Sequence, residues 1–105
     1  MTDRELELIE KTESADSTIA IEATVTLCKE FLFPRKEFER AEYLLFGLAG
    51  FQSNSLGFII ELTLGEAYIG MGEITRAKRF LEIALASGID SVQGEATGLL
   101  ETISG

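Results

Sequence analysis

The residues of this chain that could do chemistry are mainly carboxylates, because it has eighteen aspartates and glutamates, one cysteine and no histidine. Glu61 and Glu66, for example, could form an acid–base pair on a helical surface. Such pairs are expected in any chain this acidic, so they carry little weight. Without histidine, the sequence lacks the usual transition-metal ligand sets and the Ser/His or Cys/His pairs of nucleophilic catalysis. We therefore predict no enzyme activity, no catalytic residue, no metal site and no cofactor.

Two other features that could be reactive have simpler explanations. Cys28 stands among leucines and phenylalanines, which favours a buried small apolar residue over a reactive thiol. Arg76, Lys78 and Arg79 could suggest an anion site, but three solvated charges on an outer helix face are the simpler interpretation. No site is predicted there.

Charge and hydropathy narrow the range of partners. The net charge of −9 repels phosphate backbones and anionic lipid, so neither nucleic acid nor a membrane surface is an expected partner. The longest apolar stretch, residues 43–51, is far shorter than the roughly 20 residues of a membrane-spanning helix. The N-terminal sequence MTDRELELIEK lacks the pattern of a secretory signal, so we expect a cytoplasmic protein.

Helical periodicity is the main structural signal, and it repeats. A chain of 105 residues has room for a single domain, residues 1–105. One helical stripe is formed by Phe38, Ala41, Leu45 and Leu48, and the same intervals return 36 residues later in Ile74, Ala77, Leu81 and Ala84. An internal repeat of this length is typical of a stack of helical hairpins.

A further helix precedes each of these two. The first carries Ile21, Val25, Cys28 and Leu32 and is expected to stop before Pro34; the second carries Ile60, Leu64, Ala67 and Met71 and is expected to end at Gly72. The predicted hairpins are thus residues 18–50 and 55–88, linked by the turn formers of residues 50–55.

The two ends of the chain predict terminal helices. Residues 90–104 form a capping helix with one apolar stripe, and Asp90 with Gln93 resembles a capping box. Residues 1–17 begin with a second capping-box pattern, Thr2 and Glu5, but only Leu6 and Ile9 then repeat at helical spacing. This segment is either a helix that packs on the stack or an arm that orders on binding a partner.

Residues 64–85 resemble a known family, the tetratricopeptide repeat. The resemblance is carried by Leu64-Gly65-Glu66-Ala67-Tyr68, followed by Gly72, Ala77 and Ala84-Leu85. Gly65 and Ala77 are small where the two helices of a hairpin approach closely, and Leu64 and Tyr68 fill the space between hairpins. The resemblance implies an all-α fold of about two such antiparallel hairpins, and it extends over residues 21–88.

The sequence departs from the family's pattern at several positions. Glu61 stands at the usual tryptophan, Leu81 at an aromatic and Ile89 at the closing proline. In the upstream copy Lys29 stands where the small Gly65 lies in the downstream copy, and the spacing of 36 exceeds the family's 34.

In this family the first helix of each hairpin lines a binding groove. The resemblance places these residues on it: Ala23, Thr26, Leu27, Glu30, Phe33, Ile59, Leu62, Thr63, Glu66 and Ile69. The set lacks the lysines and asparagines with which some members grip a terminal carboxylate. An apolar trough rimmed by Glu30 and Glu66 suits an amphipathic helix with basic flanks. The alternative is that Leu27, Ile59 and Leu62 are plain core.

A second apolar patch is predicted on the helix of residues 39–50, which carries Tyr43, Leu44 and Phe46 beyond its core stripe. An exposed patch of this kind commonly marks an interaction site. The alternative is that the N-terminal or the C-terminal helix covers it.

These features predict a protein-binding chaperone or adaptor that shields an amphipathic helical segment of a partner. The size and acidity resemble small bacterial type III secretion chaperones, which hold needle or translocator subunits, sometimes with a co-chaperone. The alternative is a scaffold module that completes its stack by forming a homodimer and has no client.

Overall fold

The computed structural model describes residues 2–48 and 57–104, and within these ranges its regular structure is entirely helical. The order is α1 (Asp3–Thr12), α2 (Ser17–Leu27), the π-helical turn η1 (Cys28–Leu32), α3 (Phe38–Gly47), α4 (Gly57–Gly70), α5 (Ile74–Leu85) and α6 (Asp90–Ser104). The predicted all-α class is confirmed. The predicted link at residues 50–55 and the hairpin ends placed there lie outside the described residues. No helix in the described ranges combines the length and hydropathy needed to cross a membrane.

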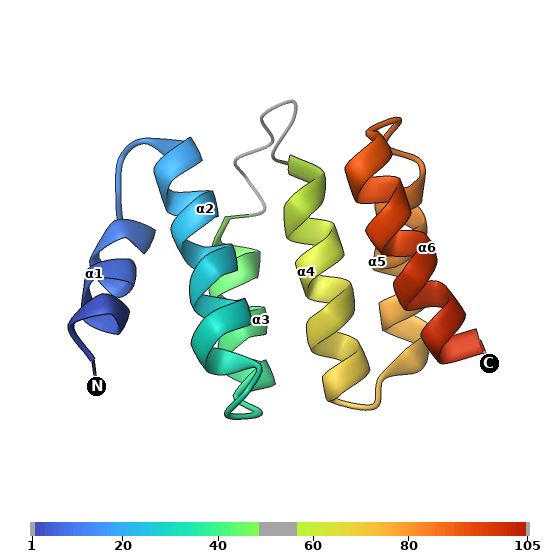
Figure 1. The fold of residues 1–105 in the computed structure, drawn as a ribbon, viewed down its shortest axis with the longest axis horizontal. Helices are drawn as coiled ribbons and strands as arrows, with labels where there is room; N and C mark the ends of the chain where they lie inside the picture. The colour runs from blue at the N-terminus through green and yellow to red at the C-terminus, as the bar shows by residue number, and fades with distance from the viewer. Residues whose placement is uncertain (1, 49–56, 105) are drawn as a thin grey trace.

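The helices form two layers. Figure 1 shows α2, α4 and α6 side by side in the nearer layer, with α3 and α5 behind them and α1 at the N-terminal end of the row. The shortest dimension of the molecule is 19 Å, which is about the thickness of two helices. The chain therefore returns to the front layer with every second helix.

Two clusters of buried side chains hold the layers together. The larger cluster contains residues from each of the helices α1 through α5, such as Leu8, Ile21, Leu45 and Tyr68. The smaller cluster lies under α6. The predicted stripes of α3 and α5 are buried or half-buried, except that Ile74, in the first turn of α5, is exposed. Cys28 is buried and its pKa is raised to about 12 by burial, as expected of a structural cysteine.

The internal repeat is present in the backbone. Lys36 and Gly72, which are 36 residues apart, both have a positive φ, 61° and 78°. The hydrogen bonds of the two turns also correspond: the amide nitrogens of Lys36 and Glu37 donate to the carbonyls of Phe33 and Leu32, and those of Gly72 and Glu73 to Ile69 and Tyr68. The turns of the two hairpins thus have the same conformation. In the first turn this conformation, which favours glycine, is adopted by a lysine, Lys36.

The first hairpin contains one extra residue, which the π-helical turn η1 absorbs. The amide of Phe33 donates to the carbonyl of Cys28 at 2.8 Å, five residues back, whereas α4 is α-helical throughout. Upstream of this turn the two copies are therefore offset by 37 residues, and Leu27-Cys28 corresponds to Leu64-Gly65. The prediction that Lys29 takes the place of Gly65 was wrong by one residue, because Cys28 fills that buried position.

The terminal helices differ from prediction in detail. The Thr2 hydroxyl accepts from the Glu5 amide, which confirms the Thr2 half of the predicted capping box, whereas the Glu5 carboxylate binds Arg35. The helix α1 packs on α2 through Leu8. Leu6 was expected on the packing face but is 47% exposed. At the other end, the capping box was wrong: Asp90 is already inside α6, and the Gln93 side chain instead donates to the carbonyl of Leu85.

Candidate partner-binding groove

The predicted groove on the front layer is partly filled by the protein itself. Four of its expected positions are buried, namely Ala23, Leu27, Leu62 and Thr63. The α2 positions are buried because the extra residue at η1 shifts the alignment of α2 by one residue. In α4, Leu62 is buried because Val92 and Ala96 of α6 pack against it. The interpretation of Leu27 and Leu62 as core is therefore correct, and their placement on a groove was wrong.

The other predicted positions reach the surface. Glu30 is exposed, and the half-buried ones are Thr26, Phe33, Ile59, Glu66 and Ile69. Three further residues of α2 and η1 reach the surface and were not among the predicted groove positions: Glu22, Val25 and Lys29. All three would have been predicted if the two copies had been aligned with a spacing of 37 residues in place of 36, because they lie 37 residues before Ile59, Leu62 and Glu66.

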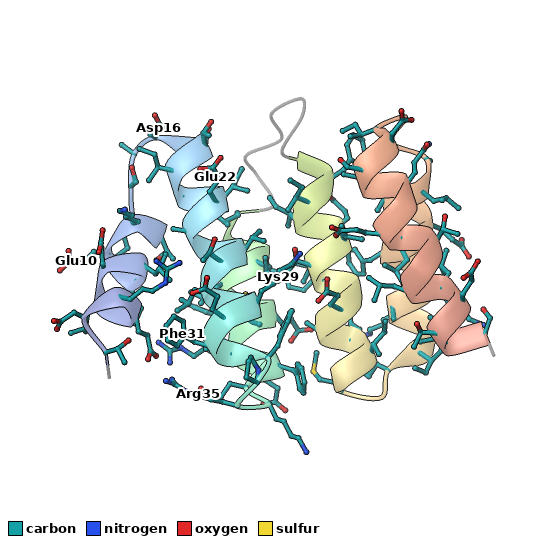
Figure 2. The ribbon with its side chains drawn as sticks, in the orientation of Figure 1. Glu10, Asp16, Glu22, Lys29, Phe31 and Arg35 are labelled. Carbon is teal, nitrogen blue, oxygen red and sulfur yellow. The ribbon has the colours of Figure 1, made fainter. Side chains whose placement is uncertain are left out.

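Ion pairs occupy both acids that were expected to receive a partner's basic flank. The Arg4 guanidinium binds the Glu30 carboxylate through two hydrogen bonds, of 2.8 and 2.9 Å, and it holds the pKa of that carboxyl below its usual range. Lys29 Nζ lies 3.8 Å from Glu66 Oε1 and 3.8 Å from Glu95 Oε2, so it connects η1, α4 and α6. Figure 2 shows Lys29 between α2 and α4. The centre of the front face is therefore polar and internally paired.

The main concavity of the described residues lies in the rear layer, between α3 and α5. This α3–α5 groove has a volume of about 1030 Å³. The residues that line it are Thr12, Glu13, Ser14, Thr24, Glu42, Tyr43, Leu44, Phe46, Gly47, Leu48, Tyr68, Arg76, Arg79 and Phe80. All three residues of the predicted second patch are among them. Tyr43 is 79% and Phe46 47% exposed, so neither α1 nor α6 covers them.

Aromatic rings cross the groove from one wall to the other. Phe46 of α3 meets Phe80 of α5 edge to face at 6.2 Å between ring centroids, and Phe80 stacks on Tyr68 of α4 at 5.5 Å. Phe80 was missed because it falls outside the core stripe of its helix. The repeat could have identified it, since Phe80 lies 36 residues after Leu44 of the predicted patch.

The α5 wall of the groove is basic. Arg76 and Arg79 both line it, and the Arg76 guanidinium lies 5.8 Å from the centre of the Tyr68 ring. The interpretation of these arginines as charges on an outer face missed this position. The groove is also lined by Glu42 of α3 and by Glu13 at the end of α1. Burial, and secondly the nearby Glu42, raise the pKa of Tyr68 to about 12.

The carboxylates considered for acid–base chemistry do not form a pair. Glu61 and Glu66 lie about 140° apart around α4 at 3.6 residues per turn. Burial raises the pKa of both. Glu61 Oε2 is buried and has no hydrogen-bond partner among the residues that the structure describes, whereas Glu66 faces Lys29 on the front layer. Among the described residues, no three His, Cys, Asp or Glu side chains converge as a metal site would require.

The groove can therefore offer an apolar, aromatic floor, one basic wall and one acidic wall, which are features of a binding surface. Comparisons of the chain with known protein families, curated proteins and solved structures gave no match.

Proposed function

We propose that this chain is a small tetratricopeptide-like module that binds an amphipathic helical segment of another protein in the α3–α5 groove, as a chaperone or adaptor. One observation carries the proposal: Tyr43 and Phe46 expose apolar surface to solvent at the groove, and the half-buried Phe80 ring continues this surface. Burial of apolar area stabilises a complex by about 25 cal/mol per Å², and aromatic side chains are frequent anchors of interfaces.

Two observations support the tetratricopeptide-like assignment. The first is the shared turn geometry of the two hairpins, 36 residues apart. The second is the position of Leu27-Cys28, which corresponds to Leu64-Gly65 once the extra residue of η1 is counted. Both observations concern helix packing, so they support the assignment of the fold. The kind of partner is inferred from the groove alone.

The shape of the groove supports a helix as the bound element. Its walls are two helices, α3 and α5, whose described contact is the pair of rings Phe46 and Phe80. A helix is about 10–12 Å wide and can lay one apolar face between such walls, as in other helix-in-groove complexes. A chaperone of this kind would cover an apolar face that otherwise aggregates, and small type III secretion chaperones, cytoplasmic in location, are one class that fits this role.

The proposal is tested with a designed amphipathic helix of about 18 residues, with leucine and phenylalanine on one face and glutamine on the other. Fluorescence anisotropy would report its binding to the full chain. We expect Phe46→Ser to weaken binding at least about tenfold, because this side chain forms part of the apolar wall. Leu6→Ser is the matched control, since Leu6 has the same exposed fraction, 47%, but lies on α1 outside the groove.

Equal binding by both variants, or no binding by the wild type, would contradict the proposal. Light scattering over a dilution series separates it from the scaffold alternative. A tight homodimer that Phe46→Ser dissociates would show that a second copy of the chain, and not a client helix, occupies the groove.

A further inference from the structure

We infer that the helix bound in the α3–α5 groove carries acidic side chains along the edge that faces α5 and basic side chains along its other edge. This inference rests on the proposed function and specifies the partner's chemistry. The net charge of the chain, −9, alone favours a wholly basic partner. The distribution of charge within the groove indicates otherwise.

The α5 wall carries an arginine, Arg79, that forms no ion pair with the described residues. Of the nine basic residues, six have a carboxylate of the described residues within 4 Å: Arg4, Lys11, Lys29, Arg35, Arg40 and Arg76. The other three are Lys36, Lys78 and Arg79, although acids outnumber bases two to one. Of these three, only Arg79 lines the groove.

Arg76 adds a second cation to the same wall. Its nearest carboxylate is that of Glu73, 3.5 Å away and exposed on the preceding turn, and its guanidinium also lies against the Tyr68 ring. Contact with an aromatic ring leaves the edge of the guanidinium free to donate to a carboxylate. Arg76 and Arg79 stand three residues apart on one helix, so they can contact acids spaced by one turn on an antiparallel or parallel neighbour.

The opposite wall has the opposite sign, with Glu42 on α3 and Glu13 just after α1. A bound helix whose apolar face meets Phe46 and Phe80 therefore places one polar edge against arginines and the other against glutamates. Contacts at 3–4 Å outweigh the field of the whole chain, because charges beyond about 8 Å are largely screened at physiological salt. The walls thus select both the charge of each edge and the rotation of the helix about its axis.

The test uses the full chain and three versions of the designed helix, with Glu, Gln or Lys along the edge that faces α5. For the wild type we expect the Glu edge to bind about threefold to tenfold more tightly than the Lys edge, with the Gln edge between them. Arg79→Glu should reverse this order. Lys78→Glu is the matched control, since it makes the same change of charge on the same helix at an exposed position that does not line the groove.

The outcomes separate the two claims. Binding of the Gln-edged helix without a preference between Glu and Lys, or a preference that Arg79→Glu leaves unchanged, overturns this inference and leaves the proposed function in place. Failure of all three helices to bind overturns both. Loss of the preference in Lys78→Glu as well as in Arg79→Glu would assign it to net charge, which also overturns the inference. Circular dichroism of each variant checks that it is folded.

Discussion

Gly65 lies where α4 packs closely against α5, so one added atom should disturb the packing. A Cβ added there would lie 2.6 Å from Leu81 Cδ2 and 2.8 Å from Leu81 Cγ. Leu81 is fully buried, so any shift of its side chain must be accommodated within the core. We predict that Gly65→Ala lowers the free energy of unfolding by about 1–3 kcal/mol, the usual cost of overpacking.

The matched control is Gly98→Ala in α6, where an added Cβ meets no atom within 4 Å. This change should raise the free energy of unfolding by about 0.5–1 kcal/mol, since alanine is the better helix former. Urea unfolding followed by circular dichroism measures both. Equal effects of the two substitutions would show that helix propensity, and not the contact with α5, governs position 65.

Residue-scale reasoning from the sequence found the packing positions and missed the charge partners. Gly65, Ala77 and Cys28 could be assigned to the core because their small size has a local explanation. The pairing of Glu5 with Arg35, and of Lys29 with Glu95, could not be predicted, because it depends on which helices become neighbours.

The helix α1 is fixed by a buried acid as well as by its apolar face. Glu5 is fully buried, and both of its carboxylate oxygens accept hydrogen bonds of 2.8 Å from Arg35, in the turn before α3. We predict that Arg35→Gln releases α1, because it leaves the Glu5 carboxylate buried without its cation. Hydrogen exchange should then be faster in residues 3–12. Arg40→Gln removes an exposed pair 3.9 Å long with Glu37 and only the smallest of the effects that lower the pKa of Glu5, so it should leave α1 protected.

The same helix should respond to acid. Arg35 lowers the pKa of Glu5 and Arg4 lowers the pKa of Glu30, relative to the ordinary value of 4.5. Acids whose pKa is lowered by folding stabilise the fold above the unfolded pKa, and this stabilisation is lost as the pH falls through the folded value. Exchange in α1 is therefore expected to rise first as the pH drops below 4.5. Protection of α1 that is independent of pH in this range would contradict the role of these pairs.

If η1 accommodates one extra residue, removing a residue from it should leave the fold intact. Deleting Lys29 should convert residues 28–32 to α-helix and align Leu-Cys-Glu-Phe-Leu with Leu-Gly-Glu-Ala-Tyr of α4. It removes two ion pairs 3.8 Å long, one to the half-buried Glu66 and one to the exposed Glu95. We expect the free energy of unfolding to change by about 1 kcal/mol or less. Deleting Glu66, at the corresponding place in α4, removes no extra residue and rotates the preceding turns by about 100°, so cooperative unfolding should be lost. Similar denaturation curves for both deletions would show that η1 does not absorb an insertion.

Element-scale prediction succeeded where the period was regular and failed at the insertion. The hairpin turns were found from Pro34 and Gly72, and the stripes of α3 and α5 from their intervals of three and four. The π-helical turn was not predicted, because the spacing of Ile21, Val25, Cys28 and Leu32 also fits a regular helix. Since a shift of one residue changes the exposed face of α2, the predicted groove residues there were displaced with it.

The whole molecule has two faces of different character. Ion pairs that join η1, α4 and α6 occupy the front, while the rear exposes aromatic side chains between α3 and α5. The sequence predicted the patch at Tyr43, Leu44 and Phe46, but not that Phe80 and two arginines complete it. That assembly depends on the superposition of two hairpins, which periodicity within each helix does not specify.

The most direct test of the central claim, that a partner helix binds in the α3–α5 groove, is an NMR titration of the isotopically labelled chain with the Gln-edged helix. Amide shifts should change in residues 42–48 of α3 and 76–80 of α5, and remain unchanged around Glu22, Lys29 and Glu95 on the front layer. Shifts confined to the front layer, or no shifts at saturating peptide, would contradict the account.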